Sequence, residues 1–146
     1  MFTKILVPID GSDLAFEALD VACEVAKTYK GQIMILSIFR HHSAMERSFS
    51  MASGSKNPES LDDVLSAYAK EIVEEGKARA RAHGVEAVRG FVRGGQVAKQ
   101  ILAFAKSNEI DLIVIGTQGQ GDLSGYLLGG VSQKVAGLAQ CPVLVV

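Results

Sequence analysis

A cluster of glycines toward the C-terminal end of the chain is the feature of this sequence best suited to ligand chemistry. Six of the 15 glycines fall in a window of fifteen residues: Gly116, Gly119, Gly121, Gly125, Gly129 and Gly130. Without Cβ atoms, such a turn lets a phosphate approach the backbone closely. A helical pattern follows, and the N–H groups and dipole at a helix start favour an anion. The cluster therefore indicates a phosphate site or, alternatively, a tight turn that packs a helix closely.

A second polar group follows the first apolar stretch of the sequence. Residues 2–9 (FTKILVPI) are typical of a buried strand, and the turn DGSD at residues 10–13 offers side chains that cap helices. The Asp10 carboxylate can cap the following helix or face the sugar of a ligand, and both interpretations stay open. Beside the glycine cluster, Ser132 adds a hydroxyl that can donate to a phosphate.

Motifs for efficient nucleotide chemistry are absent from the sequence. It contains no GxxxxGK[ST], which excludes a P-loop lysine in that arrangement, and no GxGxxG follows the first strand. ATP hydrolysis also needs charge stabilisation and usually Mg²⁺. The glycine window offers Asp122 and Ser124 but no Lys, Arg or His, and nothing in the sequence places a distant cation such as Lys134 there. Nothing in the sequence places Arg93 near the glycine window either. Nucleotide binding with slow or no turnover is therefore favoured over efficient catalysis.

Residue types that bind metals or form disulfides are few. His41 and His42 are adjacent, so in an extended segment their side chains point to opposite faces, and no third His or Cys lies nearby. No metal site is expected. Cys23 and Cys141 lie far apart without a CxxC motif, and we expect both to be free thiols that pack as small apolar residues.

The hydrophobic pattern predicts the elements that must position these residues. Strands of the buried type are predicted at residues 2–9, 33–39, 85–92, 111–115 and 143–146. Apolar residues at helical spacing predict helices at residues 14–26, 61–83 and 127–138, and another helix that opens at Gly94-Gly95. Gly31 is expected to end the first helix. Residues 40–60 have no clear period, which predicts a functional loop or a short helix there.

This alternation predicts an α/β domain over residues 1–146, with an irregular insertion at about residues 40–60. Strands that are apolar on both faces are typical of an open, mostly parallel sheet with helices on both faces. Ligands of such sheets bind at the carboxyl ends of the strands, where the strand order reverses. The two polar groups follow the first and fourth strands, so a ligand is predicted between them.

Composition excludes several classes of protein. A chain of 146 residues with 48% hydrophobic content builds one core and is too short for a two-domain dinucleotide enzyme. A net charge of −1 argues against a broad face for nucleic acid. No apolar run approaches the ~18 residues of a membrane span, so no direct membrane insertion is expected. The first residues lack the apolar region of a signal peptide, so a cytoplasmic location is expected.

Over its whole length the chain resembles a universal stress protein domain. The matching segments are KILVPIDGS at residues 4–12, DLIVIGTQG at 111–119, LLGGVSQKV at 127–135 and CPVLVV at 141–146. Nucleotide-binding members of that family carry Gly-x-x-Gly and, after a fixed spacing, Gly followed by Ser or Thr. Here Gly116 and Gly119 are followed after nine residues by Gly129, which matches that spacing. Gly130 stands in place of Ser or Thr, which loses one donor to phosphate, worth about 0.5–1.5 kcal/mol, and keeps the backbone N–H.

The resemblance implies a fold like that of the adenine nucleotide alpha hydrolases, with strand order 3-2-1-4-5. It implies ATP or AMP, with or without Mg²⁺, between the ends of the first and fourth strands. Asp10 is implied at the ribose, and the residues implied at the adenine are Pro8, Ile9 and the backbone of Ile38. The residues implied around the phosphates are Gly116, Gly119, Gly129, Gly130, Val131 and Ser132.

Two segments are candidate interaction surfaces. The last strand, from Val143 to Val146, is apolar, and at a sheet edge such a strand invites aggregation unless it is covered. Antiparallel pairing with the same strand of a second copy would cover it, and the resemblance implies that homodimer. Met45, Phe49 and Met51 in the irregular segment are expected to cover the domain or its pocket, or to anchor a partner protein.

Three hypotheses about function follow. The first is an ATP- or AMP-binding regulatory homodimer of the stress response, a switch or adaptor, which the resemblance extends to the regulation of partners such as membrane transporters. The second is a nucleotide-free protein-interaction module of the same fold, and the third is a slow ATPase. The glycine spacing favours the first over the second, and the lack of catalytic groups favours it over the third.

Overall fold

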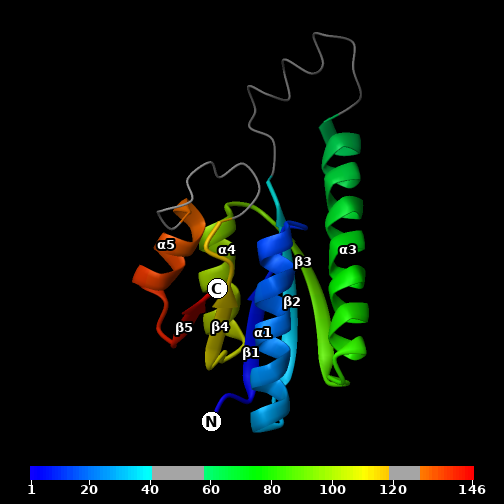
Figure 1. Cartoon of the computed structure of the whole chain (residues 1–146). Helices are drawn as coiled ribbons and strands as arrows, with labels where there is room; N and C mark the ends of the chain where they lie inside the picture. The colour runs from blue at the N-terminus through cyan, green and yellow to red at the C-terminus, as the bar shows by residue number, and fades with distance from the viewer. Residues whose placement is uncertain (41–57, 119–128) are drawn as a thin grey trace.

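Five strands form one sheet in the computed structural model, which describes residues 1–40, 58–118 and 129–146. The strands are β1 (Lys4–Pro8), β2 (Gln32–Phe39), β3 (Val88–Gly94), β4 (Leu112–Ile115) and β5 (Val143–Val145). Their order across the sheet is β3-β2-β1-β4-β5, and all neighbours are parallel (Figure 1). The α/β class and the strand order 3-2-1-4-5 are therefore confirmed.

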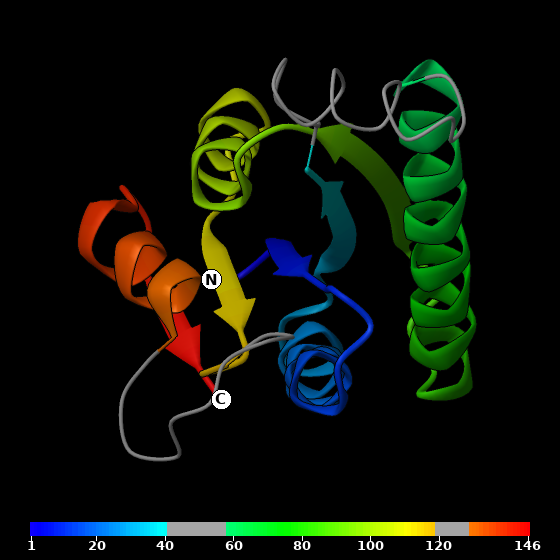
Figure 2. The same ribbon diagram turned by 90° about the horizontal axis from the view of Figure 1, so that it is seen from above.

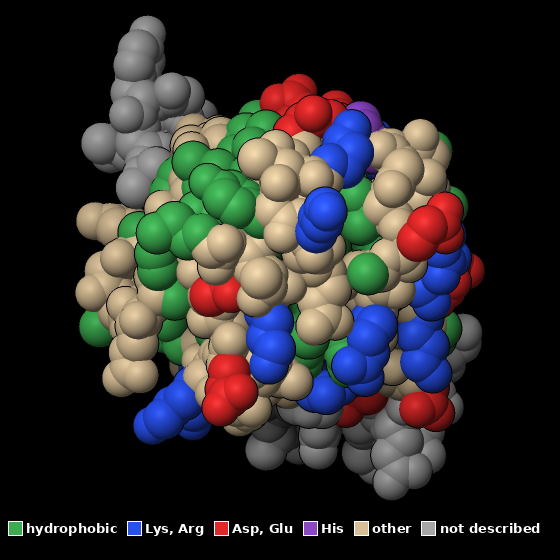
Figure 3. Space-filling model, turned by 90° about the horizontal axis from the view of Figure 1, so that it is seen from below, with side chains coloured by type: hydrophobic (Ala, Val, Ile, Leu, Met, Phe, Trp, Pro, Cys, Tyr) green, Lys and Arg blue, Asp and Glu red, His purple; other side chains and the backbone are tan. Residues whose placement is uncertain are grey.

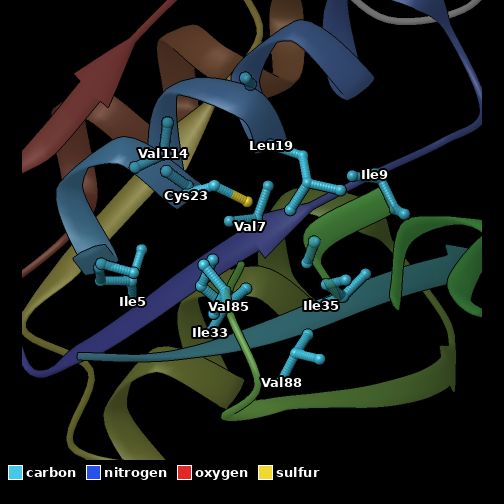
Figure 4. Packing of buried hydrophobic residues seen from close by; sticks show 14 of the residues in the cluster. Ile5, Val7, Ile9, Leu19, Cys23, Ile33, Ile35, Val85, Val88 and Val114 are labelled. Carbon is cyan, nitrogen blue, oxygen red and sulfur yellow. The ribbon is translucent and has the colours of Figure 1, made fainter. Parts of the chain in front are cut away.

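Helices cover both faces of this sheet. The described helices are α1 (Asp13–Tyr29), α3 (Pro58–Ala82), α4 (Val97–Ser107) and α5 (Gly130–Leu138). α1 and α3 lie on one face, and α4 and α5 lie on the other (Figure 2). Successive strand residues point to opposite faces, so Ile5 and Val7 pack with α1 and α3 (Figure 4), whereas Leu6 packs with α4 and α5. Burial on both faces explains the continuous apolar runs of the strands.

The third strand lies further along the chain than the sequence predicted, while the other four agree with their predictions within two residues at each end. β3 covers Val88–Gly94 rather than residues 85–92. Val85 belongs to the turn after α3, where its N–H donates to the Ala80 carbonyl at 3.0 Å. Its side chain is buried in the core, which explains why it was counted as part of the strand.

α4 begins at Val97, so the predicted helix start at Gly94-Gly95 is wrong. The Gly95 N–H donates to the Phe39 carbonyl at 3.0 Å, so this part of the chain still continues the pairing of β3 with β2. Gly95 has a φ of +135°, which glycine adopts without strain, and the chain then turns into α4. This turn brings the start of α4 to the carboxyl edge of the sheet.

The end of α1 differs in detail from the prediction. The helix ends at Tyr29, and the residue in the left-handed conformation is Lys30, with a φ of 55°. Gly31 lies against the beginning of the chain, where an added Cβ would be 2.5 Å from the Phe2 carbonyl oxygen. Close packing, rather than capping geometry, therefore requires glycine at position 31.

Two segments carry sequence predictions that lie outside the described residues. Residues 41–57 hold most of the irregular insertion, and residues 119–128 hold the middle of the glycine cluster and the predicted start of the last helix. The predictions concerned are those for His41, His42, Met45, Phe49, Met51, Gly119, Asp122 and Ser124.

The surface seen from below, at the amino ends of the strands, carries acidic and basic side chains interspersed with one another (Figure 3). Hydrophobic side chains gather in this view on the side where Figure 1 places α5 and β5. No helix in the described part of the chain combines the length and the apolar character needed to cross a membrane.

Candidate functional site

A cavity of about 780 Å³ opens at the carboxyl ends of β1, β2 and β4. The strand order reverses at this point, since β2 and β4 flank β1 on opposite sides. The volume lies within the range of small-molecule and cofactor sites. Eight predicted site residues line the cavity: Pro8, Ile9, Asp10, Ile38, Gly116, Gly130, Val131 and Ser132. Gly129 directly precedes one group of them, and Gly119 lies outside the described residues.

The turn between β1 and α1 is held by two side chains with different roles. The Asp10 Oδ1 atom accepts from the Ser12 N–H at 2.9 Å, and Ser12 Oγ accepts from the Ala15 N–H at 3.3 Å. Ser12 is therefore the N-cap of α1, and Asp10 shapes the turn that precedes it. Gly11, with a φ of 88°, allows this turn. The capping role considered for Asp10 belongs to Ser12, and Asp10 lines the cavity.

Thr117 joins three parts of the chain at the other side of the cavity. Its N–H donates to the carbonyl of Val146 at 2.8 Å, just after β5. Its carbonyl accepts from the Gly129 N–H at 2.6 Å and from the Ser132 hydroxyl at 2.8 Å. These bonds hold together the two ends of the segment between β4 and α5.

The Ser132 hydroxyl is hydrogen-bonded to the protein backbone. Its Oγ lies 2.8 Å from the Thr117 carbonyl and 3.0 Å from the Gly129 carbonyl, and the side chain is only 2% exposed. A hydroxyl has one proton to donate, so this geometry disagrees with the expected donation from Ser132 to a phosphate. The first bond within α5 runs from the Gln133 N–H to the Gly129 carbonyl, so the N–H groups of residues 130–132 precede the helical ladder. The first turn of α5 therefore offers the cavity backbone N–H groups rather than the Ser132 hydroxyl.

Gly116 and Gly130 are glycines for different reasons. A Cβ on Gly116 would lie 3.1 Å from the Leu14 carbonyl oxygen, so close packing of β4 against α1 by itself favours glycine there. A Cβ on Gly130 would meet no atom of the described residues within 4 Å, so these residues leave room for a side chain at that position. Of the two, only Gly130 is a position where the side chain can be changed without disturbing the packing.

The apolar wall of the cavity is built where β2 extends beyond β1. The Ile9 N–H donates to the Leu36 carbonyl at 2.9 Å, so Leu36 directs its backbone groups toward β1. Backbone N–H and C=O groups of residues two apart in a strand point the same way, so those of Ile38 also point toward the side of β1. However, β1 ends at Pro8, which pairs with Leu36. The backbone of Ile38 therefore points into the space beyond β1, where it can bond the polar edge of a ligand.

Comparison with known proteins shows which family this arrangement belongs to. The sequence model of the universal stress protein family matches residues 1–146, the whole chain. The chain belongs to the universal stress protein family. One curated relative, universal stress protein YxiE of Bacillus subtilis (strain 168), is 38% identical over 150 residues, which cover 100% of this chain and 99% of the relative.

Solved structures of universal stress proteins share this fold. UspA from Lactobacillus plantarum superposes with a TM-score of 0.86 at 25% identity, covering 99% of this chain and 97% of that one. A universal stress protein solved in complex with cAMP superposes with a TM-score of 0.75 at 25% identity, again covering 99% and 97% of the two chains. The fold of this family member is therefore established over nearly its entire length.

Several cavity residues of this universal stress protein were not predicted from its sequence. They are Arg40, Gln96, Val97, Ala98, Ile101, Gln118 and Lys134. Those at the start of α4 were missed because the helix was predicted to begin too early. Lys134 follows Gly130 by four residues, the spacing that places two residues on one helix face, and this signal could have identified it. Arg93 lies elsewhere, with its guanidinium 5.7 Å from the ring centroid of Phe91 on β3.

The described residues with displaced pKa values do not line the cavity. One cluster of these residues joins α1 to α3. Arg79 Nε and Nη2 each donate to the carboxylate of Asp20 at 2.7 Å, and these bonds lower the pKa of Asp20. His83 Nε2 lies 2.9 Å from the same carboxylate. Burial raises the pKa of the Cys23 thiol to about 11. Within the described ranges, no three His, Cys, Asp or Glu side chains gather as metal ligands.

Proposed function

We propose that this universal stress protein binds an adenine nucleotide, ATP or AMP, in the cavity and acts as a regulatory protein rather than an efficient catalyst. One observation carries the proposal: a single cavity combines an apolar wall from β1 and β2 with the N–H groups at the start of α5. These two surfaces suit an adenine ring and a phosphate chain respectively. The relative solved in complex with cAMP supports an adenine ligand on this fold.

In the proposed complex, Pro8, Ile9 and Ile38 hold the adenine. Their side chains line one end of the cavity, and the backbone of Ile38 beyond β1 bonds the polar edge of the base. Asp10 faces the ribose. A carboxylate accepts several hydrogen bonds, so a role at the ribose is compatible with the bond from the Ser12 N–H.

The phosphates lie, in this proposal, against the start of α5. Val131 and Ser132 contribute backbone N–H groups, and Gly130 contributes its N–H without the hydroxyl found in other nucleotide-binding members. Gly116 and Gly129 flank the segment that follows β4, and their role is to bring the backbone close to the phosphates. Gly119 keeps the phosphate role that its spacing suggests.

Slow hydrolysis or none is the expected behaviour of this site. Among the residues that the structure describes, the cavity lining offers one carboxylate, Asp10, and two cations, Arg40 and Lys134. Efficient phosphoryl transfer also needs a base or a positioned water and usually Mg²⁺. The described residues contribute no cluster of carboxylates that could hold Mg²⁺. The ion would therefore enter together with ATP and be held mainly by its phosphates. Binding is therefore the proposed role, and a slow ATPase is the alternative.

We propose a homodimer in which β5, the strand predicted from Val143 to Val146, pairs with β5 of a second copy. β5 lies at the edge of the sheet, and Leu144 on it is 38% exposed. The hydrophobic side chains that gather on this side of the molecule favour a partner there (Figure 3). Such an edge, left uncovered, is prone to aggregate.

The cellular part of the proposal is regulation of a partner in a stress response, in the cytoplasm. Cys23 and Cys141 are both free thiols, which suits a reducing compartment. The partner is proposed to contact the segment at residues 40–60, and a membrane transporter is one partner that fits the family. If no nucleotide is bound, a protein-interaction module of the same fold is the alternative function.

The nucleotide itself provides the test. Freshly purified protein is denatured, and the released small molecules are separated by chromatography; the stripped protein is then titrated with ATP and AMP by calorimetry. We expect an adenine compound to be released and saturable binding to follow. If the protein neither releases an adenine compound nor binds one, the proposal is wrong.

A matched pair of variants at Gly130 shows whether binding occurs in this cavity. Gly130→Asp adds a carboxylate where the phosphate is proposed, and Gly130→Asn adds a neutral side chain of nearly the same shape, with space available for either. Repulsion is expected to weaken ATP binding strongly in Gly130→Asp and much less in Gly130→Asn. Equal affinities for the two variants would mean that the nucleotide binds elsewhere.

A further inference from the structure

Lys134 is the charged residue that α5 presents to the cavity. It lines the cavity together with Gly130, Val131 and Ser132 of the same helix. We propose that Lys134 binds the phosphates beyond the first one and so makes the site selective for nucleoside di- and triphosphates over monophosphates. This inference rests on the proposed function, and it names the class of ligand that the site takes.

The position of Lys134 on the helix directs it toward the phosphates. It follows Gly130 by four residues and Val131 by three, so all three share one face of α5. Helical side chains lean toward the N-terminus of their helix, so the ammonium group of Lys134 reaches back toward the start of α5. A nucleotide whose first phosphate meets the N–H groups there would carry its further phosphates within reach of Lys134.

The side chains of the first three residues of α5 cannot take this role. Ser132 is 2% exposed and donates its proton to backbone carbonyls, and Gly130 has no side chain. Val131 is apolar. Lys134 is exposed, and no ion pair joins it to another residue of the described chain. Its charge is therefore available to a ligand.

Arg40 is the rival cation, and its position differs in a way that can be tested. Arg40 follows β2, two residues after Ile38, at the end of the cavity proposed for the base. Lys134 lies on α5, whose first turn is proposed to meet the phosphates. If the phosphate chain runs toward α5, removing Lys134 alters the preference for phosphate number, and removing Arg40 alters the affinity for all adenine ligands alike.

The experiment measures a series of ligands against a series of variants. Adenosine, AMP, ADP and ATP are titrated by calorimetry without Mg²⁺, so that only the protein neutralises the phosphates. The variants are Lys134→Gln, Lys134→Arg, Arg40→Gln and Lys99→Gln. Lys99 is an exposed residue of α4 outside the cavity lining, so Lys99→Gln changes the net charge by the same amount and serves as the matched control.

In the wild-type protein, affinity is expected to rise from AMP to ADP to ATP. Lys134→Gln should weaken ATP by about three- to tenfold and AMP by less than about twofold, as expected for a charge-assisted contact near the surface. Lys134→Arg should keep most of the preference, and Lys99→Gln should leave it unchanged. The ATP preference of wild type should also shrink as salt concentration rises.

The outcomes separate this inference from the proposed function. If wild-type protein binds adenine nucleotides but shows no preference for more phosphates, or if Lys134→Gln weakens all four ligands equally, the inference is overturned and the proposed function stands. Loss of the preference in Arg40→Gln instead of Lys134→Gln also overturns it. If wild-type protein binds none of the four ligands, both the inference and the proposed function fail.

Discussion

The hydroxyl of Ser132 donates to the carbonyl of Thr117 across 2.8 Å, although the two residues are 15 positions apart in the chain. Ser132 lies in the first turn of α5, and Thr117 lies just after β4. Between them runs the rest of the glycine cluster. The bond therefore fixes where the start of α5 sits relative to the sheet, and with it the N–H groups that the cavity receives.

Removing this hydroxyl is expected to destabilise the protein. Ser132→Ala should lower the free energy of unfolding by about 1–2 kcal/mol, because a buried donor to backbone carbonyls is lost. Denaturant unfolding at equilibrium measures the change. Ser107→Ala, at the exposed end of α4, is the control and should change stability very little. Unchanged stability of Ser132→Ala together with weaker nucleotide binding would show that the hydroxyl serves a phosphate instead.

Adding a hydroxyl at Gly130 is expected to strengthen nucleotide binding. A Cβ there meets none of the residues that the structure describes within 4 Å, so Gly130→Ser should fold normally. One further hydrogen bond to a phosphate is worth about 0.5–1.5 kcal/mol, or about two- to tenfold in affinity. Calorimetry with ATP measures the gain. Gly137→Ser, on the same helix and equally open, is the control that should leave the affinity as it was.

Acid should weaken the contact between α1 and α3. Arg79 holds the pKa of Asp20 below its ordinary value of 3.8, so the charged pair contributes fully above that pH. Its contribution is lost as the pH falls through the lowered pKa of the folded protein. Asp20→Asn should reduce stability by about 1 kcal/mol at neutral pH, and the difference from wild type should shrink as the pH falls below the ordinary pKa of an aspartate.

Asp63→Asn is the control for this pH series, since Asp63 is an exposed carboxyl on α3 outside the Asp20 cluster. Unfolding by urea is measured from neutral to acid pH for the three proteins. A difference between Asp20→Asn and wild type that stayed constant down to the lowest pH would contradict the assignment of the effect to the Asp20 carboxylate.

A proline in β5 should separate the proposed homodimer. Val146 directs its N–H to Ile115 at 2.9 Å, so by alternation the N–H of Val145 points to the free edge of the sheet. Val145→Pro removes that donor and keeps the bonds to β4, whereas Val145→Thr keeps both. Light scattering is expected to find a monomer for Val145→Pro and a dimer for Val145→Thr. A dimer in both would place the interface elsewhere.

The sequence predicted the architecture because each strand is buried on both faces. Ile5, Leu6 and Val7 are all fully buried, and they give the continuous apolar run that marks a central parallel strand. The ends of β3 were predicted poorly for a related reason. Val85 is as apolar and buried as a strand residue, yet its N–H bonds within a turn, and the pattern of side chains does not reveal that bond.

The candidate site was predictable where it depends on the ends of strands. Asp10 and Gly116 follow β1 and β4, and the rule for parallel sheets brought them to one cavity. The direction of the Ser132 hydroxyl was not predictable, because its acceptor is a carbonyl distant in the sequence. Lys134 was predictable in principle, because its spacing of four residues from Gly130 places both on one face of α5.

The hydrogen bond from the Thr117 N–H to the Val146 carbonyl bears on how the protein should be prepared. Any peptide fused after Val146 would emerge beside Thr117 and at the free edge of β5. A purification tag placed there would compete with the second copy of the proposed homodimer. Met1 is 85% exposed, and the N-terminus lies at the bottom of Figure 1, away from the carboxyl ends of the strands, so a tag attached before it leaves the cavity unobstructed.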